Sequence, residues 1–120
     1  MTLQADAVGK TSESQSEPHG LLFGCVLDGS GGCRAIDWDE ACAWRPGTAG
    51  EVMWLHLDRT MDDVEDFLEK TLELTEPTLE AMLSNETRPH AFREGDGLVT
   101  VLRGINFNPG AEPEDMIAMQ

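Results

Sequence analysis

The sequence predicts an α/β domain of the mixed α+β kind, in which a mixed β-sheet packs with helices. Three observations lead to this prediction. Apolar, β-prone segments recur at Leu21–Leu27 and 51–58, an amphipathic acidic segment with helical spacing follows at 61–72, and strand-like segments joined by glycine-containing turns return after Asn85. Strands interspersed with helices in one short chain are typical of sheets covered by helical layers.

The composition is that of a small, strongly acidic domain. The chain has 120 residues, and 8 Lys and Arg stand against 23 Asp and Glu, which gives a formal net charge of −15. Nucleic-acid binding is disfavoured, because it requires cationic side chains that displace counterions from phosphate. Attraction to an anionic membrane surface is disfavoured for the same reason. Cations and basic surfaces remain compatible partners. No apolar run approaches the ~20 residues of a membrane helix, so this chain is expected to be soluble.

The three cysteines, Cys25, Cys33 and Cys42, indicate reduced thiols in a cytoplasmic domain. Their odd number and wide spacing, without a Cys-x-x-Cys motif, do not fit a disulfide framework. The histidines also lie in separate segments, so no paired zinc ligands are present in the sequence.

Residues 1–19 are predicted to form a disordered polar tail, because Ser, Thr, Glu and Gln dominate there without periodicity. The ordered domain is therefore assigned to residues 20–120. It begins with a predicted hairpin, in which Leu21–Leu27 is followed by a glycine-rich turn at 28–32 and a returning strand. The glycines are not interpreted as a nucleotide-binding loop, since no helical pattern follows them.

The segment "EVMWLHLD" at 51–58 predicts a third strand. Val52, Trp54 and His56 fall on one face and Met53 with its alternate neighbours on the other, and both faces are largely apolar. This pattern is typical of an interior strand covered on both sides by helices. His56 could act as a ligand or a base, but a hydrogen-bonded packing role is favoured for a lone histidine in such a strand.

An acidic helix is predicted to begin at Thr60, whose pairing with Asp63 resembles a capping box. Its buried face is expected to comprise Met61, Val64, Phe67, Leu68 and Leu72. A second short helix is predicted to open at Pro77, where the missing N–H is tolerated, with Leu79, Met82 and Leu83 as its apolar stripe.

The acidic helix carries the candidate metal-binding face, formed by Asp62, Asp63 and Asp66. Carboxylate oxygens there could hold a hard cation such as magnesium, whereas a solvated helix face is the favoured alternative. A weaker expectation is that the negative field raises the local concentration of divalent cations within a screening length of about 8 Å.

After Asn85 the pattern returns to strands. A short strand is predicted at 88–93, a turn at 94–97, a long strand at 98–107, and a last strand at 116–119 that folds back antiparallel on the long one. Arg103 interrupts an apolar face of the long strand. It therefore needs a carboxylate, backbone carbonyls or an exit to solvent, because a buried unpaired guanidinium costs several kcal/mol.

The segments "LLFGCVLDGSGG", "VMWLHLDRT", "LTEPTLEAMLSNETRP", "LVTVLRGINFNPG" and "PEDM" follow one another in order. As a set they resemble the N-terminal cytoplasmic domain of the CorA-type metal-ion transporter family, and within it the zinc-transporting ZntB branch. The resemblance covers roughly residues 20–120. Arg88, Pro89, Arg103 and Asn106 match family positions and are interpreted as structural residues for strand-end hydrogen bonding and ion pairing.

The resemblance implies a cytoplasmic α/β domain whose mixed sheet lies between helical layers. It also implies homopentamers that form a funnel beneath a membrane pore, on the cytoplasmic side of the cell inner membrane. The transmembrane helices and the Gly-Met-Asn pore signature of the family are absent from this sequence. We therefore expect a fragment that meets the membrane only through a missing C-terminal region. Divalent cations, zinc or magnesium, are the expected transported or regulatory ions, and no cofactor is required.

The sequence is compatible to different degrees with two other function classes. A stand-alone acidic protein-interaction domain with the same fold is the alternative to a regulatory and assembly role in a transporter. An enzyme is disfavoured, because no nucleophile–base pair or paired metal motif is present in the sequence. The resemblance supplies no metal site on a matching motif, so the acidic face remains the only candidate.

Overall fold

The computed structural model describes residues 19–47 and 50–120. The predicted polar tail therefore lies, apart from His19, outside the described residues. The elements in chain order are β1 (Leu21–Leu27), β2 (Cys33–Ala35), α1 (Trp38–Ala43), β3 (Val52–Leu57), α2 (Asp62–Asp66), the π-helical turn η1 (Phe67–Thr71), α3 (Glu76–Leu83), β4 (His90–Glu94), β5 (Gly97–Gly104) and β6 (Ile117–Met119).

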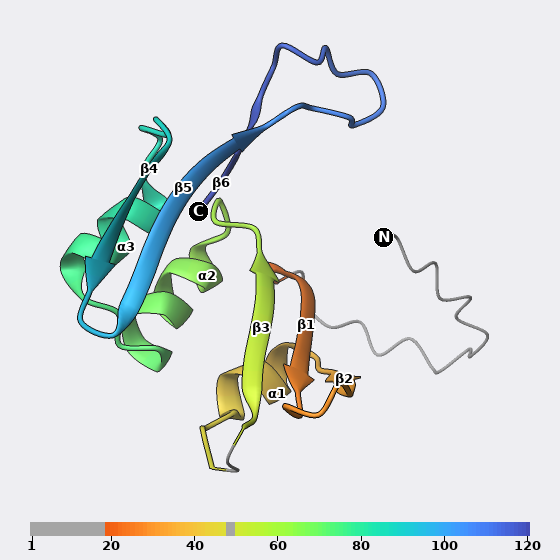
Figure 1. Cartoon of the computed structure of the whole chain (residues 1–120), viewed down its shortest axis with the longest axis vertical. Helices are drawn as coiled ribbons and strands as arrows, with labels where there is room; N and C mark the ends of the chain where they lie inside the picture. The colour runs from red at the N-terminus through yellow and green to blue at the C-terminus, as the bar shows by residue number, and fades with distance from the viewer. Residues whose placement is uncertain (1–18, 48–49) are drawn as a thin grey trace.

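The strands form two antiparallel sheets, in the orders β2-β1-β3 and β4-β5-β6 (Figure 1). The predicted α+β class is confirmed, but within the described residues the strand pairs are antiparallel, where a mixed sheet was expected. The connections explain part of this. Short turns join β1 to β2 and β4 to β5, and a short turn can only join antiparallel neighbours.

The predicted first hairpin is confirmed, and Asp28 organises its turn. One oxygen of the Asp28 carboxylate, Oδ1, accepts hydrogen bonds from the Ser30 N–H at 2.7 Å, the Ser30 hydroxyl at 2.9 Å and the Gly32 N–H at 3.0 Å. Gly29 adopts a φ of 79°, a conformation that glycine enters without steric cost. Leu27 and Cys33 then form the first pair of the hairpin ladder.

The third strand, β3, is covered on one face only, so the prediction of an interior strand covered on both sides was wrong. Met53 and Leu55 pack against the helices, whereas Val52, Trp54 and His56 are exposed. β3 is also an edge strand of its sheet. The apolar character of both faces misled the prediction, because an apolar face predicts burial only when some element of the same chain covers it.

Helix α1 was not predicted. It begins with a capping box in which Asp37 Oδ1 accepts from the Glu40 N–H at 2.8 Å and Glu40 Oε2 accepts from the Asp37 N–H at 2.9 Å. Ala41 is fully buried and packs with Val26 and Ile36 beneath the first sheet. The Asp-x-x-Glu pair was the available sequence signal, but a helix of six residues is too short to show a clear period.

The acidic helix is confirmed, but its predicted cap is wrong. Met61 is the N-cap and contributes no side-chain hydrogen bond, while the Thr60 hydroxyl donates to Asp58 Oδ1 at 2.6 Å. The predicted apolar face is largely correct. Val64, Phe67 and Leu68 form a buried cluster, whereas Leu72 is exposed; this cluster also contacts Trp38 and the inner side chains of β3.

The second predicted helix is confirmed as α3, with Pro77 in its first turn. Its stripe of Leu79, Met82 and Leu83 is half-buried against the cluster around Phe67. Between the helices, Glu73 has a φ of 51°, the single non-glycine residue with positive φ among the described residues.

The long strand β5 ends at Gly104, three residues before the predicted end at 107. Val99 and Val101 are buried on one face, and α3 lies against this strand. The last predicted strand is confirmed as β6, which pairs antiparallel with β5 in the register Leu102↔Met119. The chain that joins them, after Gly104, extends away from both sheets (Figure 1).

Candidate functional site: an acidic groove between two helices

The structure does not bring the three predicted metal-face residues together. The Asp63 carboxylate points inward, where Oδ2 accepts from the Gly20 N–H at 3.0 Å. Asp66 forms an ion pair with Lys70 at 2.6 Å, and Asp62 is exposed. Within residues 19–47 and 50–120, no group of three or more His, Cys, Asp or Glu side chains is placed to hold a metal ion.

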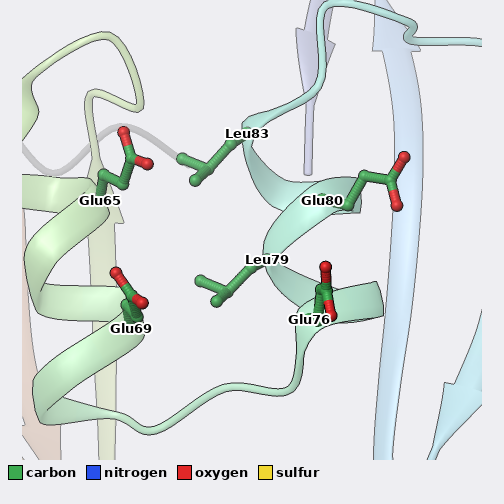
Figure 2. A pocket seen from close by; sticks show the side chains of 6 residues that line it. All are labelled: Glu65, Glu69, Glu76, Leu79, Glu80 and Leu83. Carbon is green, nitrogen blue, oxygen red and sulfur yellow. The ribbon is translucent and has the colours of Figure 1, made fainter.

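A different set of acids lines a groove of about 300 Å³ between the α2–η1 segment and α3 (Figure 2). Glu65 and Glu69 belong to the first wall. From the opposite wall, Leu79 and Leu83 project toward them (Figure 2). The complete lining is Glu65, Glu69, Glu76, Leu79, Glu80 and Leu83.

The groove concentrates negative charge. Glu65 and Glu69 are four residues apart along one helical segment, and Glu76 and Glu80 are four residues apart along the other, so each pair places like charges on one side of its helix. The ion pairs found between described residues, Lys70–Asp66 and Arg88–Glu86, do not involve these four glutamates. The groove can therefore attract cations from solvent, within about 8 Å at physiological salt.

Hydrogen bonds and burial shift the pKa of a few groups. The hydrogen bonds from Ser30 and Gly32 lower the pKa of Asp28, and those from Thr60 lower the pKa of Asp58. The hydrogen bond and charge of Asp66 raise the pKa of Lys70.

The Cys42 thiol is not an activated nucleophile. Burial, followed by the charges of Asp39 and Asp63, raises the pKa of Cys42. The thiolate is the reactive form of cysteine, so a raised pKa keeps Cys42 in its unreactive form at neutral pH. Cys42 packs instead against the cluster formed by Val64, Phe67 and Leu68.

His56 lies on the exposed face of β3, opposite Phe23 in the strand register. The favoured prediction, a hydrogen-bonded packing role, was therefore wrong. The cause is the same uncovered face that leaves Trp54 exposed, because alternate residues of a strand share one face.

The four family-matching positions lie around the second sheet. The guanidinium of Arg103 donates from Nε to the Thr87 carbonyl at 2.9 Å and from Nη2 to the Thr87 hydroxyl at 3.2 Å. Arg88 pairs with Glu86 at 3.0 Å on the surface. Asn106 Oδ1 accepts from the Asn108 N–H at 3.1 Å, and Pro89 is exposed before β4. Arg103 thus meets two of the three alternatives expected from the sequence, because it is exposed to solvent and also has a backbone carbonyl partner.

The acids of α3 were missed at the sequence level. Glu76 and Glu80 were not predicted as site residues, because the candidate metal-binding face was placed on the first helix, which has the longer run of acids. Their spacing of four residues next to Leu79 and Leu83 was the available signal. Recognising the groove also required knowing that the two helices lie side by side, which no local pattern shows.

The family model described as "CorA-like Mg2+ transporter protein" matches residues 49–120, more than half of the chain. The chain belongs to this CorA-like family. The resemblance stated from the sequence is thereby confirmed, and the family is one of transporters by its description.

Individual relatives within this CorA-like family agree. The divalent cation transporter CmaX of Pseudomonas aeruginosa is 36% identical over 105 residues, which cover 87% of this chain and 31% of CmaX. The zinc transport protein ZntB of Yersinia enterocolitica is 37% identical over 99 residues, which cover 82% of this chain and 29% of ZntB. The chain thus spans about a third of the length of these curated relatives.

Solved structures share the fold. The structure of full-length CmaX aligns with a TM-score of 0.77 and 36% identity over 87% of this chain and 32% of that one. The crystal structure of the ZntB cytoplasmic domain from Vibrio parahaemolyticus aligns with a TM-score of 0.67 and 25% identity over 84% of this chain and 38% of that one. In the part of the CorA-like chain that the structure describes, no helix has the length and apolar character needed to cross a bilayer.

Proposed function

We propose that the chain is part of the cytoplasmic domain of a CorA-like divalent-cation transporter, where it contributes to assembly and regulation of the pore. The observation that carries the proposal is the alignment with full-length CmaX, at a TM-score of 0.77 over 87% of this chain. The similarity to a cytoplasmic domain of ZntB supports the placement on the cytoplasmic side of the inner membrane. Contact with the membrane would come from a region outside these 120 residues.

In this proposal zinc or magnesium is the cargo or the regulatory ion, and the role of the chain is not enzymatic. The acidic groove supplies an attractive field and no fixed coordination sphere. Its four carboxylates stand on two walls with two leucines between them, and inner-sphere binding of Mg²⁺ requires converging oxygens at about 2.1 Å. The groove therefore enriches hydrated cations near the protein, which are released again without a large energetic penalty.

The assembly role has a direct test. The full 120-residue chain replaces the matched region of CmaX, and the purified fusion protein is compared with CmaX by native mass spectrometry in detergent. We expect a closed homo-oligomer of the same subunit number as CmaX, which the family resemblance predicts to be a pentamer. A folded fusion protein that remains monomeric while CmaX assembles would contradict the assembly role.

A further inference from the structure

A second groove, of about 550 Å³, lies between α3 and the hairpin of β4 and β5. We call it the β5 groove. The helix α3 lies against β5 (Figure 1), and the loop before α3 and the residue that follows β6 complete the walls. The β5 groove shares no lining residue with the acidic groove between the α2–η1 segment and α3. Its volume falls in the range of roughly 300 to 1,000 Å³ that is typical of sites for small organic molecules.

The walls of the β5 groove are mainly apolar. Leu74 and Met82 line it and also pack against the buried cluster around Phe67, so the groove borders the protein core. On the strand side, Val99 is buried, whereas its neighbour Leu98 is 68% exposed. An apolar ligand in the groove would remove Leu98 from water, which is favourable in proportion to the apolar area covered.

The charged and amide groups of the β5 groove offer hydrogen-bond acceptors. Glu73 and the half-buried Glu94 line it, and the ion pairs found between described residues involve neither carboxylate. The Gln120 side chain donates from Nε2 to the Ser84 carbonyl at 3.4 Å, which leaves its own carbonyl oxygen as an acceptor. Among the described residues, no Lys, Arg or His lines the groove. The threonine hydroxyls of the lining can donate or accept, so a positive charge must come from the ligand.

This lining favours an organic ammonium group over a metal ion. Metal ions such as Mg²⁺ require several converging oxygen ligands, which apolar walls do not supply, and no group of three or more His, Cys, Asp or Glu side chains in the described chain is placed to hold one. A quaternary ammonium group is best bound by aromatic faces, and no aromatic side chain of the described residues lines the groove. A primary ammonium group has three N–H donors for carboxylate and amide oxygens.

We propose that the β5 groove binds a small organic amine. Its protonated primary amino group pairs with the carboxylate of Glu94, close to the second carboxylate of the lining, Glu73, and its apolar body covers Leu98 and Met82. This inference goes beyond the proposed function and does not depend on assembly or transport. The binding measurement and the transport measurement are therefore separate, and failure of one leaves the other unaffected.

The probe is phenylbutylamine, and phenylbutanol is the neutral molecule of the same shape. Each is titrated into the full 120-residue chain, and the amide NMR chemical shifts are followed. We expect the amine to shift the amides of Thr78, Leu98 and Thr100, which line the groove, and to bind about three- to tenfold more tightly than the alcohol. The trimethylammonium derivative of the amine should bind more weakly than the amine, because it has no N–H donor.

Matched variants assign the two parts of the site. Glu94→Gln should weaken binding of the amine about three- to tenfold and leave binding of the alcohol unchanged. Leu98→Ser should weaken both, since it removes an exposed apolar side chain that either ligand would cover. Glu112→Gln is the control, because Glu112 is an exposed acid outside the groove, and it should change neither affinity. If Glu94→Gln does not fold, Glu73→Gln, in the loop before α3, must weaken amine binding selectively.

Three results would overturn the proposal. The first is equal affinity of the chain for the amine and the alcohol, and the second is a set of shifts confined to the acidic groove around Glu65 and Glu69. The third is tighter binding of an acetylated lysine amide than of phenylbutylamine, which would assign the groove to a lysine of a partner protein. The fusion protein with CmaX supplies a further check, in which the amine should raise the thermal midpoint more than the alcohol does. A fusion protein that binds neither, while the isolated chain binds the amine, would show that the rest of the transporter closes the groove.

Discussion

Asp63 holds Gly20 in place across 43 positions of sequence, because its Oδ2 accepts the Gly20 N–H at 3.0 Å. Its other oxygen, Oδ1, is buried without a partner among the described residues. A Cβ at Gly20 would clash with Val64 Cγ2, so the backbone at this position lies directly against α2. The carboxylate that the sequence offered as a metal ligand therefore fastens the start of β1 to the acidic helix.

Replacing Asp63 by alanine should destabilise the fold by about 1–3 kcal/mol, because a charge-assisted hydrogen bond is lost and the Gly20 N–H is left unpaired. The measurement is urea unfolding followed by circular dichroism. Asp62→Ala is the matched control, since Asp62 is the exposed neighbour on the same turn, and its effect should remain within about 0.5 kcal/mol. If the two substitutions destabilised the fold equally, the hydrogen bond of Asp63 would make no specific contribution to stability.

Glu73→Gly should stabilise the protein. Glu73 has a φ of 51° at the end of η1, and a side chain in this left-handed conformation costs roughly 1–2 kcal/mol, which glycine avoids. We expect a gain of about 1 kcal/mol in the free energy of unfolding. Glu80→Gly, inside α3, should instead cost about 1 kcal/mol, because glycine is a poor former of helix interiors. A loss of stability for both variants would mean that the conformation of Glu73 carries no strain.

Asp28→Ala should lower stability at neutral pH and have little effect in acid. The folded-state pKa of Asp28 is lowered by hydrogen bonds from Ser30 and Gly32. Its contribution is therefore complete above the unfolded pKa of about 3.9 and is lost as the pH falls through the lower folded value. Urea midpoints of the two proteins should converge as the pH falls through the lowered folded-state pKa of Asp28. Asp96→Ala, in the turn between β4 and β5, is the control, and a pH-independent difference for Asp28→Ala would contradict the assignment.

Glu69→Gln should reduce repulsion in the groove. The substitution removes one of the four carboxylates that line the groove, and relief of its like-charge pairing with Glu65, four residues away, is worth about 0.2–0.5 kcal/mol at low salt. Thermal midpoints should rise in low salt, and their dependence on salt should become shallower. Glu86→Gln is the control with the opposite expectation, because Glu86 is paired with Arg88. An unchanged salt dependence for Glu69→Gln would mean that the groove generates no significant field.

The strands were predictable where local chemistry determines them. The segments Leu21–Leu27 and Ile117–Met119 were located from apolar runs bounded by turn residues, and the position of Pro77 in the first turn of α3 followed from its fixed φ. Helix α1 was missed, because its capping box begins a helix of only six residues and the burial of Ala41 stabilises it. The formation of α1 therefore depends on tertiary packing, which cannot be predicted from a local sequence pattern.

The candidate site was less predictable than the fold. The sequence showed the acidic residues on one helix. The orientations of the Asp63 and Asp66 side chains, however, depend on their partners, Gly20 at 43 positions away and Lys70 at four. The groove requires two helices to lie side by side, and the uncovered face of β3 requires the absence of a covering element in the described chain. Both are properties of the assembled domain, so periodicity alone predicted burial for Trp54, which is exposed.

The central claim, that this chain works as the matched part of a CorA-like transporter, is tested most directly by uptake of divalent cations. The fusion protein in which the chain replaces the matched region of CmaX is reconstituted into liposomes that contain an indicator for zinc or magnesium. We predict uptake at a rate comparable to that of CmaX, with a dependence on ionic strength that weakens when Glu65 and Glu69 are both replaced by lysine. A correctly inserted and assembled fusion protein that moves neither ion, under conditions where CmaX does, would contradict the account.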